Sequence, residues 1–314
     1  MRENFVTHFN SGFLLQGISL YLSMQRHLDD FTLWVICLDD LVSKSLRKIE
    51  LPNIKIIERD VWETEELRTL RDQRSFREYC WTVTPSVPKF VFNIDANVKR
   101  VTYVDADLWF RKDPRSIFNE FSDSKKSVLI TDHHYAPEFD QSSISGQYCV
   151  QFMTFVRDDS EIVRSHWESQ CRDWCYAYHD NGKFGDQKYL DAWPSKYEAY
   201  VHLLGDKTAI LAPWNATRFP YGNSLIWHFH GVSITRQGKK IVVDYGYAPL
   251  PDVTIDNIYE PYLGDLRKAA GMLREDVIHH LPQRKSSLLT ISKAFSKRIY
   301  FRCLRMSCHK VVII

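Results

Sequence analysis

The chain lacks the apolar segments that secretion or membrane insertion would require. No stretch of 18 apolar residues occurs, and the opening residues, MRENFVTHFN, contain no apolar run of the signal-peptide kind. A membrane-spanning helix needs about 20 consecutive apolar residues, and a signal peptide needs a central apolar region. The sequence predicts neither, so we expect a cytoplasmic protein.

Cysteine is present in an odd number, seven, without a regular framework. Because disulfide-rich secreted proteins have paired and regularly spaced cysteines, this pattern favours a reducing compartment. Cys171 and Cys175 are four residues apart on one face of a predicted helix, but two further ligands at a usable spacing are lacking nearby. The pattern therefore favours buried thiols over a zinc site.

Acidic residues are missing from the end of the chain, where none follows Asp276. The basic residues beyond position 281 are Arg284, Lys285, Lys293, Lys297, Arg298, Arg302, Arg305 and Lys310. Since the whole chain carries a net charge of +2, these eight leave the remainder at −6. We expect a main domain over residues 1–281 and a separate basic segment over residues 282–314, with no nucleic-acid partner.

The basic segment also has an apolar stripe with the spacing of one helix face. Its members recur at steps of three and four: Leu288, Ile291, Phe295, Ile299, Cys303 and Met306. One interpretation is an amphipathic helix that attaches the protein to an anionic membrane surface on its cytoplasmic side. The other is a helix that packs on the main domain or pairs with another chain. The terminal Lys310-Val-Val-Ile-Ile also fits a short strand.

Length and composition indicate a folded protein with one large domain, or one domain with a small appendage. The chain has 314 residues, of which 44% are apolar and 25% charged, an ordinary globular composition. Aromatic residues reach 14%. Such an excess suits stacking on sugars or bases, although large cores use the same residues.

Apolar runs and helical periodicity alternate along the chain in a way that predicts an α/β fold with a mostly parallel sheet. A helix is expected over 14–27, followed by a buried strand, FTLWVICLDD, and then by a short helix and a further strand up to residue 58. Residues 62–97 are predicted to be mainly helical, and strands are expected around 101–110, 127–131 and 148–156. Further helices are expected over 162–178 and after Gly185, the latter ending at Pro194. The sequence LIWHFHG, over 225–231, is expected to be a strand.

Two carboxylates, Asp105 and Asp107, follow the apolar strand that includes Val101 and Val104. Ligands of open α/β sheets bind at the carboxyl ends of the strands, and two carboxylates there can hold Mg²⁺ or Mn²⁺ that bridges to phosphate oxygens. A polar strand end or surface turn is the alternative. Phosphotransferases with an aspartyl nucleophile also carry Asp-X-Asp, usually with Thr or Val two residues later. Trp109 at that position disfavours them.

Two further elements carry chemistry-bearing residues. His228 and His230 alternate on the predicted strand, so they would share a face, and imidazole is a suitable third ligand for Mn²⁺. Gly185 permits close approach of a ligand, while Asp186 and Gln187 at the start of a helix offer hydrogen bonds to sugar hydroxyls. Asp186 as a simple helix cap is the alternative.

In this order, YVDAD, GDQKYLD and HFHG resemble the motifs of glycosyltransferases of the GT-A fold. The sequence is most similar to family-eight glycosyltransferases and their bacterial relatives in surface-polysaccharide assembly, over roughly residues 5–231. The resemblance implies a metal-dependent, retaining transfer of a sugar, with a UDP-sugar as the foremost donor, to a glycan or lipid-linked acceptor.

The resemblance also implies roles for individual residues. Asp105, Asp107 and His228 would bind Mn²⁺ or Mg²⁺, and Asp186 and Gln187 would act on the donor sugar. Residues of the opening segment and of the two motifs would bind the nucleotide part of the donor: Thr7, Phe9, Asn10, Ala106 and Gly231.

The chain departs from the family pattern at two places. Where the family has an Asn-X-Gly element, this chain has Tyr148-Cys149-Val150-Gln151. The family's lysine after the His-X-X-Gly motif is also missing, and Arg236 or Lys239 would have to substitute for it. Arg68, Arg71, Arg74 and Arg77 recur at a three-residue spacing and form either a solvated helix face or a site for an anionic diphosphate.

Two other functions remain as alternatives. A nucleotidyltransferase that makes nucleotide-sugars would carry a basic, Gly-rich phosphate loop after the first strand, whereas this chain has FNSGFLLQG without a basic residue. A non-catalytic carbohydrate-binding protein on the same fold would have lost site residues. The presence of Asp105, Asp107, Gln187 and His228 argues against that loss.

Overall fold

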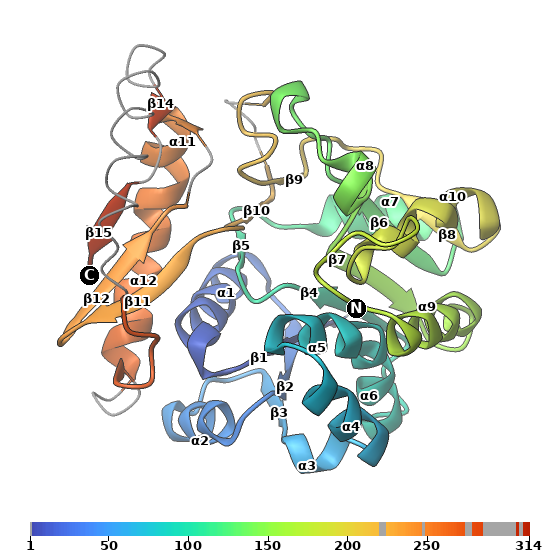
Figure 1. Cartoon of the computed structure of the whole chain (residues 1–314), viewed down its shortest axis with the longest axis horizontal. Coiled ribbons are helices and arrows are strands. Elements are labelled where there is room, and N and C mark those ends of the chain that lie inside the picture. The colour runs from blue at the N-terminus through green and yellow to red at the C-terminus, as the bar shows by residue number, and fades with distance from the viewer. Residues whose placement is uncertain (1, 220–223, 247–248, 274–277, 285–305, 308–309) are drawn as a thin grey trace.

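The centre of the molecule is a sheet made from the apolar runs of the sequence (Figure 1). The computed structural model describes residues 2–219, 224–246, 249–273, 278–284, 306–307 and 310–314. Within them, the strands of this sheet are β1 (Glu3–Phe9), β2 (Phe31–Cys37), β3 (Ile54–Ile57), β4 (Arg100–Val104), β6 (Val128–Asp132), β7 (Tyr148–Val156) and β8 (Val201–Leu203). Their order is β3-β2-β1-β4-β7-β6-β8. Only β7 runs antiparallel to its neighbours, so the prediction of a mostly parallel α/β sheet is confirmed.

Helices cover both faces of the sheet because successive strand residues point to opposite sides. Phe5 and Phe9 of β1 join one apolar layer, and Val6 between them joins the other. The helices that contribute to the first layer are α1 (Leu14–His27), α2 (Asp40–Ile49), α7 (Arg115–Ser124) and α12 (Glu260–Met272). Those of the second layer are α3 (Arg59–Trp62), α4 (Glu65–Gln73), α5 (Phe76–Val83), α6 (Val87–Ile94), α9 (Glu161–Asp173) and α10 (Trp193–Lys196).

A small sheet beside the carboxyl end of β4 begins directly after Asp107, the second carboxylate of the acidic motif. It consists of β5 (Leu108–Phe110), β10 (Ile226–His228) and β9 (Ile210–Leu211), in the order β5-β10-β9. β10 lies antiparallel to β5, with His228 opposite Leu108. This pairing brings residues more than 100 positions apart in the sequence to one edge of the molecule.

The C-terminal part of the chain, from β11 onward, packs beside α1 and this small sheet (Figure 1, orange to red). It contains β11 (Ser233–Gln237), β12 (Lys240–Asp244), β13 (Leu250–Pro251), α11 (Asp252–Thr254), β14 (Met306–Ser307) and β15 (Val311–Ile313), besides α12. The buried Asp265 of α12 accepts hydrogen bonds from Arg26 of α1 and from Trp109 Nε1 of β5, at 2.8 and 2.7 Å. Tyr262 stacks on Phe229, with ring centroids 3.6 Å apart. α12 thus contacts both β5 and the residue that follows β10.

Two predicted helix ends are wrong. The helix expected to reach residue 178 ends at Asp173, because Trp174 is extended and starts a segment of packed aromatic rings with Tyr176 and Tyr178. Pro194 does not end a helix but lies in the first turn of α10. A proline is tolerated there because the first N–H groups of a helix have no intrahelical acceptor.

The basic segment is described only in part. The predicted amphipathic helix falls on residues 285–305, outside the described residues, apart from Met306, which lies in β14. Val311–Ile313 form β15, antiparallel to β12, as a short terminal strand. Of the helices in the described ranges, none combines the length and the apolar character needed to cross a bilayer.

Candidate functional site

A cavity of about 910 Å³ opens at the edge of the sheet where β1 and β4 end and β7 begins. Its size lies within the range of small-molecule sites. The walls come from α5, from the turn before Gln187 and from the segment after β10, as well as from the three strands. Most of the predicted site residues lie in this cavity.

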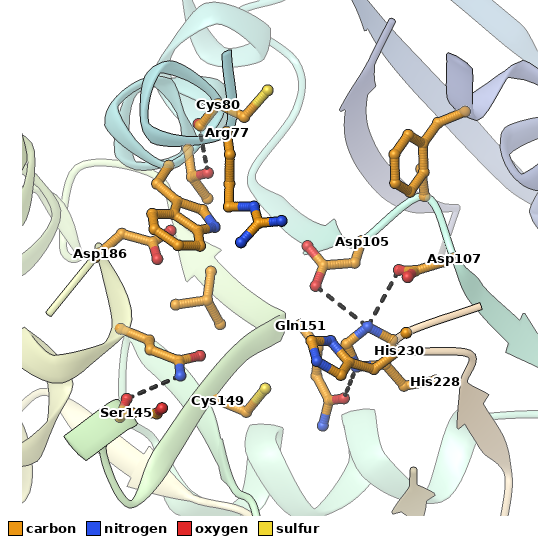
Figure 2. A pocket seen from close by; sticks show the side chains of 18 of the residues that line it. Arg77, Cys80, Asp105, Asp107, Ser145, Cys149, Gln151, Asp186, His228 and His230 are labelled. Carbon is orange, nitrogen blue, oxygen red and sulfur yellow. Dashed lines mark hydrogen bonds and ion pairs between the residues drawn. The ribbon is translucent and has the colours of Figure 1, made fainter. Parts of the chain in front are cut away.

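Asp105, Asp107 and His228 converge on one wall of the cavity (Figure 2). His228 Nε2 lies 3.1 Å from Asp107 Oδ1 and 3.7 Å from Asp105 Oδ2. One ligand atom from each residue lies within 4.8 Å of the others, so the cluster has the dimensions of a metal site. Two carboxylate oxygens and one imidazole nitrogen suit Mn²⁺, and also accept Mg²⁺.

Backbone hydrogen bonds hold this cluster in register. Phe229 N donates to Asp107 O at 2.9 Å, which continues the pairing of β10 with β5. Asp105 N donates to Gln151 O at 3.0 Å, which extends the pairing of β4 with β7 by one residue. The ligand atoms therefore project from the turn between β4 and β5 and from the end of β10, whose relative positions are fixed by the main chain.

The charges in the cluster depend on one another. Burial disfavours a charged imidazole, but Asp107 and Asp105 outweigh it and raise the pKa of His228 well above its ordinary value. Burial likewise opposes ionisation of Asp107, yet His228 prevails and lowers the pKa of that carboxyl. For Asp105, burial prevails and raises the pKa, with His228 acting in the opposite direction. The cluster holds more acidic groups than its histidine can neutralise.

Asp186 and Gln187 lie on another wall of the cavity. Gly185 before them has a φ of +54°, and a Cβ there would lie 3.2 Å from the Trp81 ring, so glycine suits this turn. Burial, and then repulsion from Asp105, raise the pKa of Asp186 well above its ordinary value. Gln187 Nε2 donates to Ser145 O at 2.8 Å, which orients the side chain.

The strand predicted over 225–231 is shorter than expected, because β10 ends at His228. His230 nevertheless lines the same cavity. Its ring centroid lies 5.5 Å from that of His228, and Trp214 lies 5.3 Å from both rings. Burial, reinforced by His228, lowers the pKa of His230 to about 4. His230 is therefore a neutral neighbour of the cluster at physiological pH.

The residues predicted to hold the nucleotide do not all reach the cavity. Phe9, Asn10, Ala106 and Gly231 line it, whereas Thr7 is fully buried and is not among the lining residues. Thr7 is on the same side of β1 as Phe5 and Phe9, facing the helix layer of α1, and His8 lines the cavity instead. Alternation along the strand makes this assignment sensitive to a shift of one residue.

The arginine row divides between two roles. Arg71 pairs with Glu63, and the buried Arg74 donates to Cys171 O at 2.7 Å, so neither serves the cavity. Arg77 lines the cavity and points from α5 toward the space in front of Asp105 (Figure 2). The row does not follow one helix face because α4 ends at Gln73 and Ser75 caps a new helix.

Several lining residues were not predicted as site residues. Trp81, His133, Cys149, Gln151 and Trp214 all border the cavity. The sequence signal for Cys149 and Gln151 was the departure from the family's Asn-X-Gly element, two positions apart on one face of β7. Arg236 and Lys239, suggested as substitutes for the missing lysine, are not lining residues.

Comparison with known proteins identifies relatives and a matching fold. No protein-family model matches the chain. The uncharacterized protein YfnF of Bacillus subtilis strain 168 is 31% identical over 289 residues, covering 89% of this chain and 93% of YfnF. YfnD of the same organism is 27% identical over 262 residues, covering 78% of this chain and 83% of YfnD.

The structure of mouse xyloside xylosyltransferase 1 superposes with a TM-score of 0.50 at 15% identity, covering 73% of this chain and 97% of that one. This similarity concerns the fold, a mostly parallel central sheet of GT-A type that is flanked by helices. On the sequence identity and coverage, the chain belongs to the same family as YfnF, with a glycosyltransferase fold of GT-A type.

Proposed function

We propose that the protein is a metal-dependent glycosyltransferase that moves a sugar from a nucleotide-diphosphate-sugar to a glycan or lipid-linked acceptor. The observation that carries the proposal is the cluster of Asp105, Asp107 and His228 in the wall of a cavity large enough for such a donor. Asp186 and Gln187 face the same cavity, and the fold is one on which glycosyl transfer occurs.

Asp105, Asp107 and His228 would hold Mn²⁺ or Mg²⁺. Their donor set fits either ion, and the surplus of carboxylates leaves negative charge that a divalent cation would neutralise. When bound, such an ion stabilises the charge that develops on a departing diphosphate. Arg77, which points into the same space, would add a further positive charge beside that group.

Asp186 and Gln187 would orient the donor sugar. Because the pKa of Asp186 is raised, this carboxyl stays protonated over a wider pH range and can donate a hydrogen bond to a sugar oxygen. Gln187 keeps its carbonyl oxygen for a sugar hydroxyl, since its Nε2 bonds to the main chain. Phe9 and Asn10 would border the base, and UDP is the foremost candidate for the nucleotide. Retention of anomeric configuration is the expected course.

A screen for donor cleavage tests the function directly. The purified protein is incubated with UDP-, GDP-, dTDP- and ADP-sugars in Mn²⁺, and the release of nucleoside diphosphate is measured. We expect release from one class of donor, and its loss in excess EDTA. Formation of pyrophosphate from a nucleoside triphosphate and a sugar phosphate would instead identify a nucleotidyltransferase. Donor binding without cleavage would identify a carbohydrate-binding protein.

Gln187→Ala separates sugar recognition from nucleotide recognition. We expect this variant to slow transfer more than it weakens the binding of free nucleoside diphosphate, because the amide faces the sugar. An equal loss of both would assign Gln187 a structural role.

The basic segment would bring the enzyme to a lipid-linked acceptor at the cytoplasmic face of a membrane. Each basic residue near an anionic leaflet contributes about 1 kcal/mol, so five give salt-sensitive attachment. The test is co-sedimentation with phosphatidylserine vesicles at low salt. We expect the wild type to bind and a full-length variant with Lys293, Lys297, Arg298, Arg302 and Arg305 changed to Gln to stay in solution. A wild type that stays in solution would leave packing or chain pairing as the role of this segment.

A further inference from the structure

We infer that Gln151 is a positioning residue, which fixes the tautomer of His228 so that the Nε2 lone pair is directed at the metal. The inference rests on the proposed metal dependence and names a residue that the motifs alone do not indicate. It applies to the metal-bound protein, in which His228 is a neutral imidazole, and it can be tested without a donor or an acceptor.

The two ring nitrogens of His228 face different partners. Nε2 faces the carboxylates, 3.1 Å from Asp107 and 3.7 Å from Asp105. Nδ1 lies 2.6 Å from Gln151 Oε1, on the opposite side of the ring (Figure 2). Gln151 is 2% exposed and His228 is 4% exposed, so water has little access to either side chain.

The position of Gln151 is set by the same strands that set the metal cluster. Gln151 lies on β7, and its carbonyl oxygen accepts the Asp105 N–H at 3.0 Å. Asp107 is tied in the same way to Phe229, the residue after His228. The main chain therefore places the amide, the imidazole and both carboxylates at fixed relative positions.

The chemistry of the pair selects one proton arrangement. A neutral imidazole carries one proton, and it can bind a metal only through the nitrogen that lacks it. An amide oxygen only accepts hydrogen bonds, so its contact with Nδ1 keeps the proton there and leaves Nε2 free for the ion. The opposite amide orientation would present an N–H to Nδ1 and force the proton onto Nε2. Such outer partners typically fix ring orientation and strengthen the ligand.

Cys149 is the other group on β7 that interacts with the His228 ring. It lies two residues before Gln151 on the same strand face, and a thiol is a weaker hydrogen-bond partner than an amide. Where the family that the sequence resembles has Asn-X-Gly, this chain carries a stretch with Cys149 and Gln151. The arrangement is thus specific to residues of this chain. Thr154, which is buried on the same strand and is not a lining residue of the cavity, provides a matched control.

Metal affinity and NMR together test the inference. Mn²⁺ affinity is measured by electron paramagnetic resonance for the wild type, Gln151→Met, Gln151→Glu and Thr154→Val. We expect Gln151→Met, which has similar size and no acceptor, to lose affinity by about 10–100-fold. Gln151→Glu should bind at least as tightly as the wild type because it restores the acceptor. Thr154→Val should remain within about threefold of the wild type, because Thr154 bonds to Thr102 and does not contact the cluster.

The tautomer is read from ¹H–¹⁵N correlations of ¹⁵N-histidine-labelled wild type loaded with Zn²⁺, which is diamagnetic. We expect a proton on Nδ1 of His228 and metal on Nε2. A bare Nδ1 in the wild type, or wild-type Mn²⁺ affinity in folded Gln151→Met, would overturn the inference. A wild type that binds no divalent ion at all would overturn the proposed metal dependence, which is a different outcome.

Discussion

The molecule contains two buried clusters of charged residues, and they differ in how far positive side chains balance the buried carboxylates. On α9, the fully buried Arg164 pairs with Glu161 and Glu168 and also donates to Pro85 O. Glu168 in turn accepts from Ser86 and Arg172. In the cavity, Asp105 and Asp107 share the positive charge of His228, and Asp186 adds a third carboxyl beside them.

The directions of the pKa shifts express this difference. Burial disfavours the charged form of Glu168, but Arg164 overrides it and lowers the pKa of that carboxyl. Burial also disfavours the charged form of Asp186, and Asp105 reinforces it, so the pKa rises. The α9 cluster is completed by the chain itself, whereas the cavity cluster retains acidic groups that would face the proposed divalent cation. Substitutions in the first should therefore cost stability, and substitutions in the second should cost function.

The largest effect is expected from Asp105→Asn and Asp107→Asn. Each removes a carboxylate from the cluster, and we expect donor cleavage in Mn²⁺ to fall by about a thousandfold. Asp105→Asn should keep or raise the free energy of unfolding, because it relieves the repulsion from Asp107 and Asp186. Cleavage rates and urea unfolding measured on the same samples check both expectations. Activity close to wild type in either variant would contradict the metal assignment.

The next effect concerns stability alone. Arg164→Met leaves Glu161 and Glu168 without their buried partner, and we expect it to reduce the free energy of unfolding by about 3 kcal/mol. The exposed Arg68, whose Nε lies 3.6 Å from Glu63, provides the control, since Arg68→Met should cost less than about 1 kcal/mol. Mn²⁺ affinity of the folded fraction should be unchanged in both. A loss of Mn²⁺ affinity in Arg164→Met would show that the two clusters are coupled.

Within the cavity, the two histidines should differ. His228→Ala removes a proposed metal ligand, and we expect Mn²⁺ affinity to fall by about a hundredfold. This is the upper end of the loss that is typical when a hydrogen-bond partner of a metal ligand is removed. His230→Ala should change it by less than about threefold, because His230 does not belong to the ligand cluster. Titration of both variants followed by electron paramagnetic resonance measures the difference. The reverse result would assign His230 as the ligand.

The smallest effect concerns the stability of the protein at acidic pH and involves His8, which lines the cavity. Burial lowers the pKa of His8 to about 4 from its ordinary value of 6.5. Protonation therefore favours the unfolded chain, and the stability that His8 contributes is present above about pH 6.5 and is lost as the pH falls toward 4. Between pH 7 and pH 5 this loss amounts to about 2 kcal/mol. Urea unfolding at both pH values should show a decrease smaller by that amount in His8→Phe. An equal decrease in both proteins would exclude His8 as its source.

Those cavity residues that are marked by local patterns can be found in the sequence. Asp105 and Asp107 follow an apolar run, and Asp186 follows a glycine with a positive φ, so both elements are visible along the chain. The face of Thr7 was harder to place, since a shift of one residue along a strand exchanges the buried and the cavity sides. Gln151 could not be assigned, because its role depends on a pairing between β4 and β7 and on a ring from β10.

Arg74 and Arg77 show that equivalent spacing in the sequence does not ensure equivalent orientation in the structure. Their spacing in the sequence is equivalent, but a helix boundary at Ser75 directs Arg74 into the interior and Arg77 toward the cavity. Periodicity describes one element at a time. The direction in which a long side chain finally points is decided by where the next helix begins.

The hydrogen bond between Trp109 and Asp265 has a consequence for biosynthesis. The two residues are 156 positions apart in the chain. At typical translation rates, Asp265 is synthesised about 10 to 30 s after Trp109. During that interval most of the strands of the central sheet are completed. Trp109 of β5 still lacks the Asp265 carboxylate that accepts its hydrogen bond. β5 therefore gains its contact with α12 late, after most of the central sheet has been synthesised.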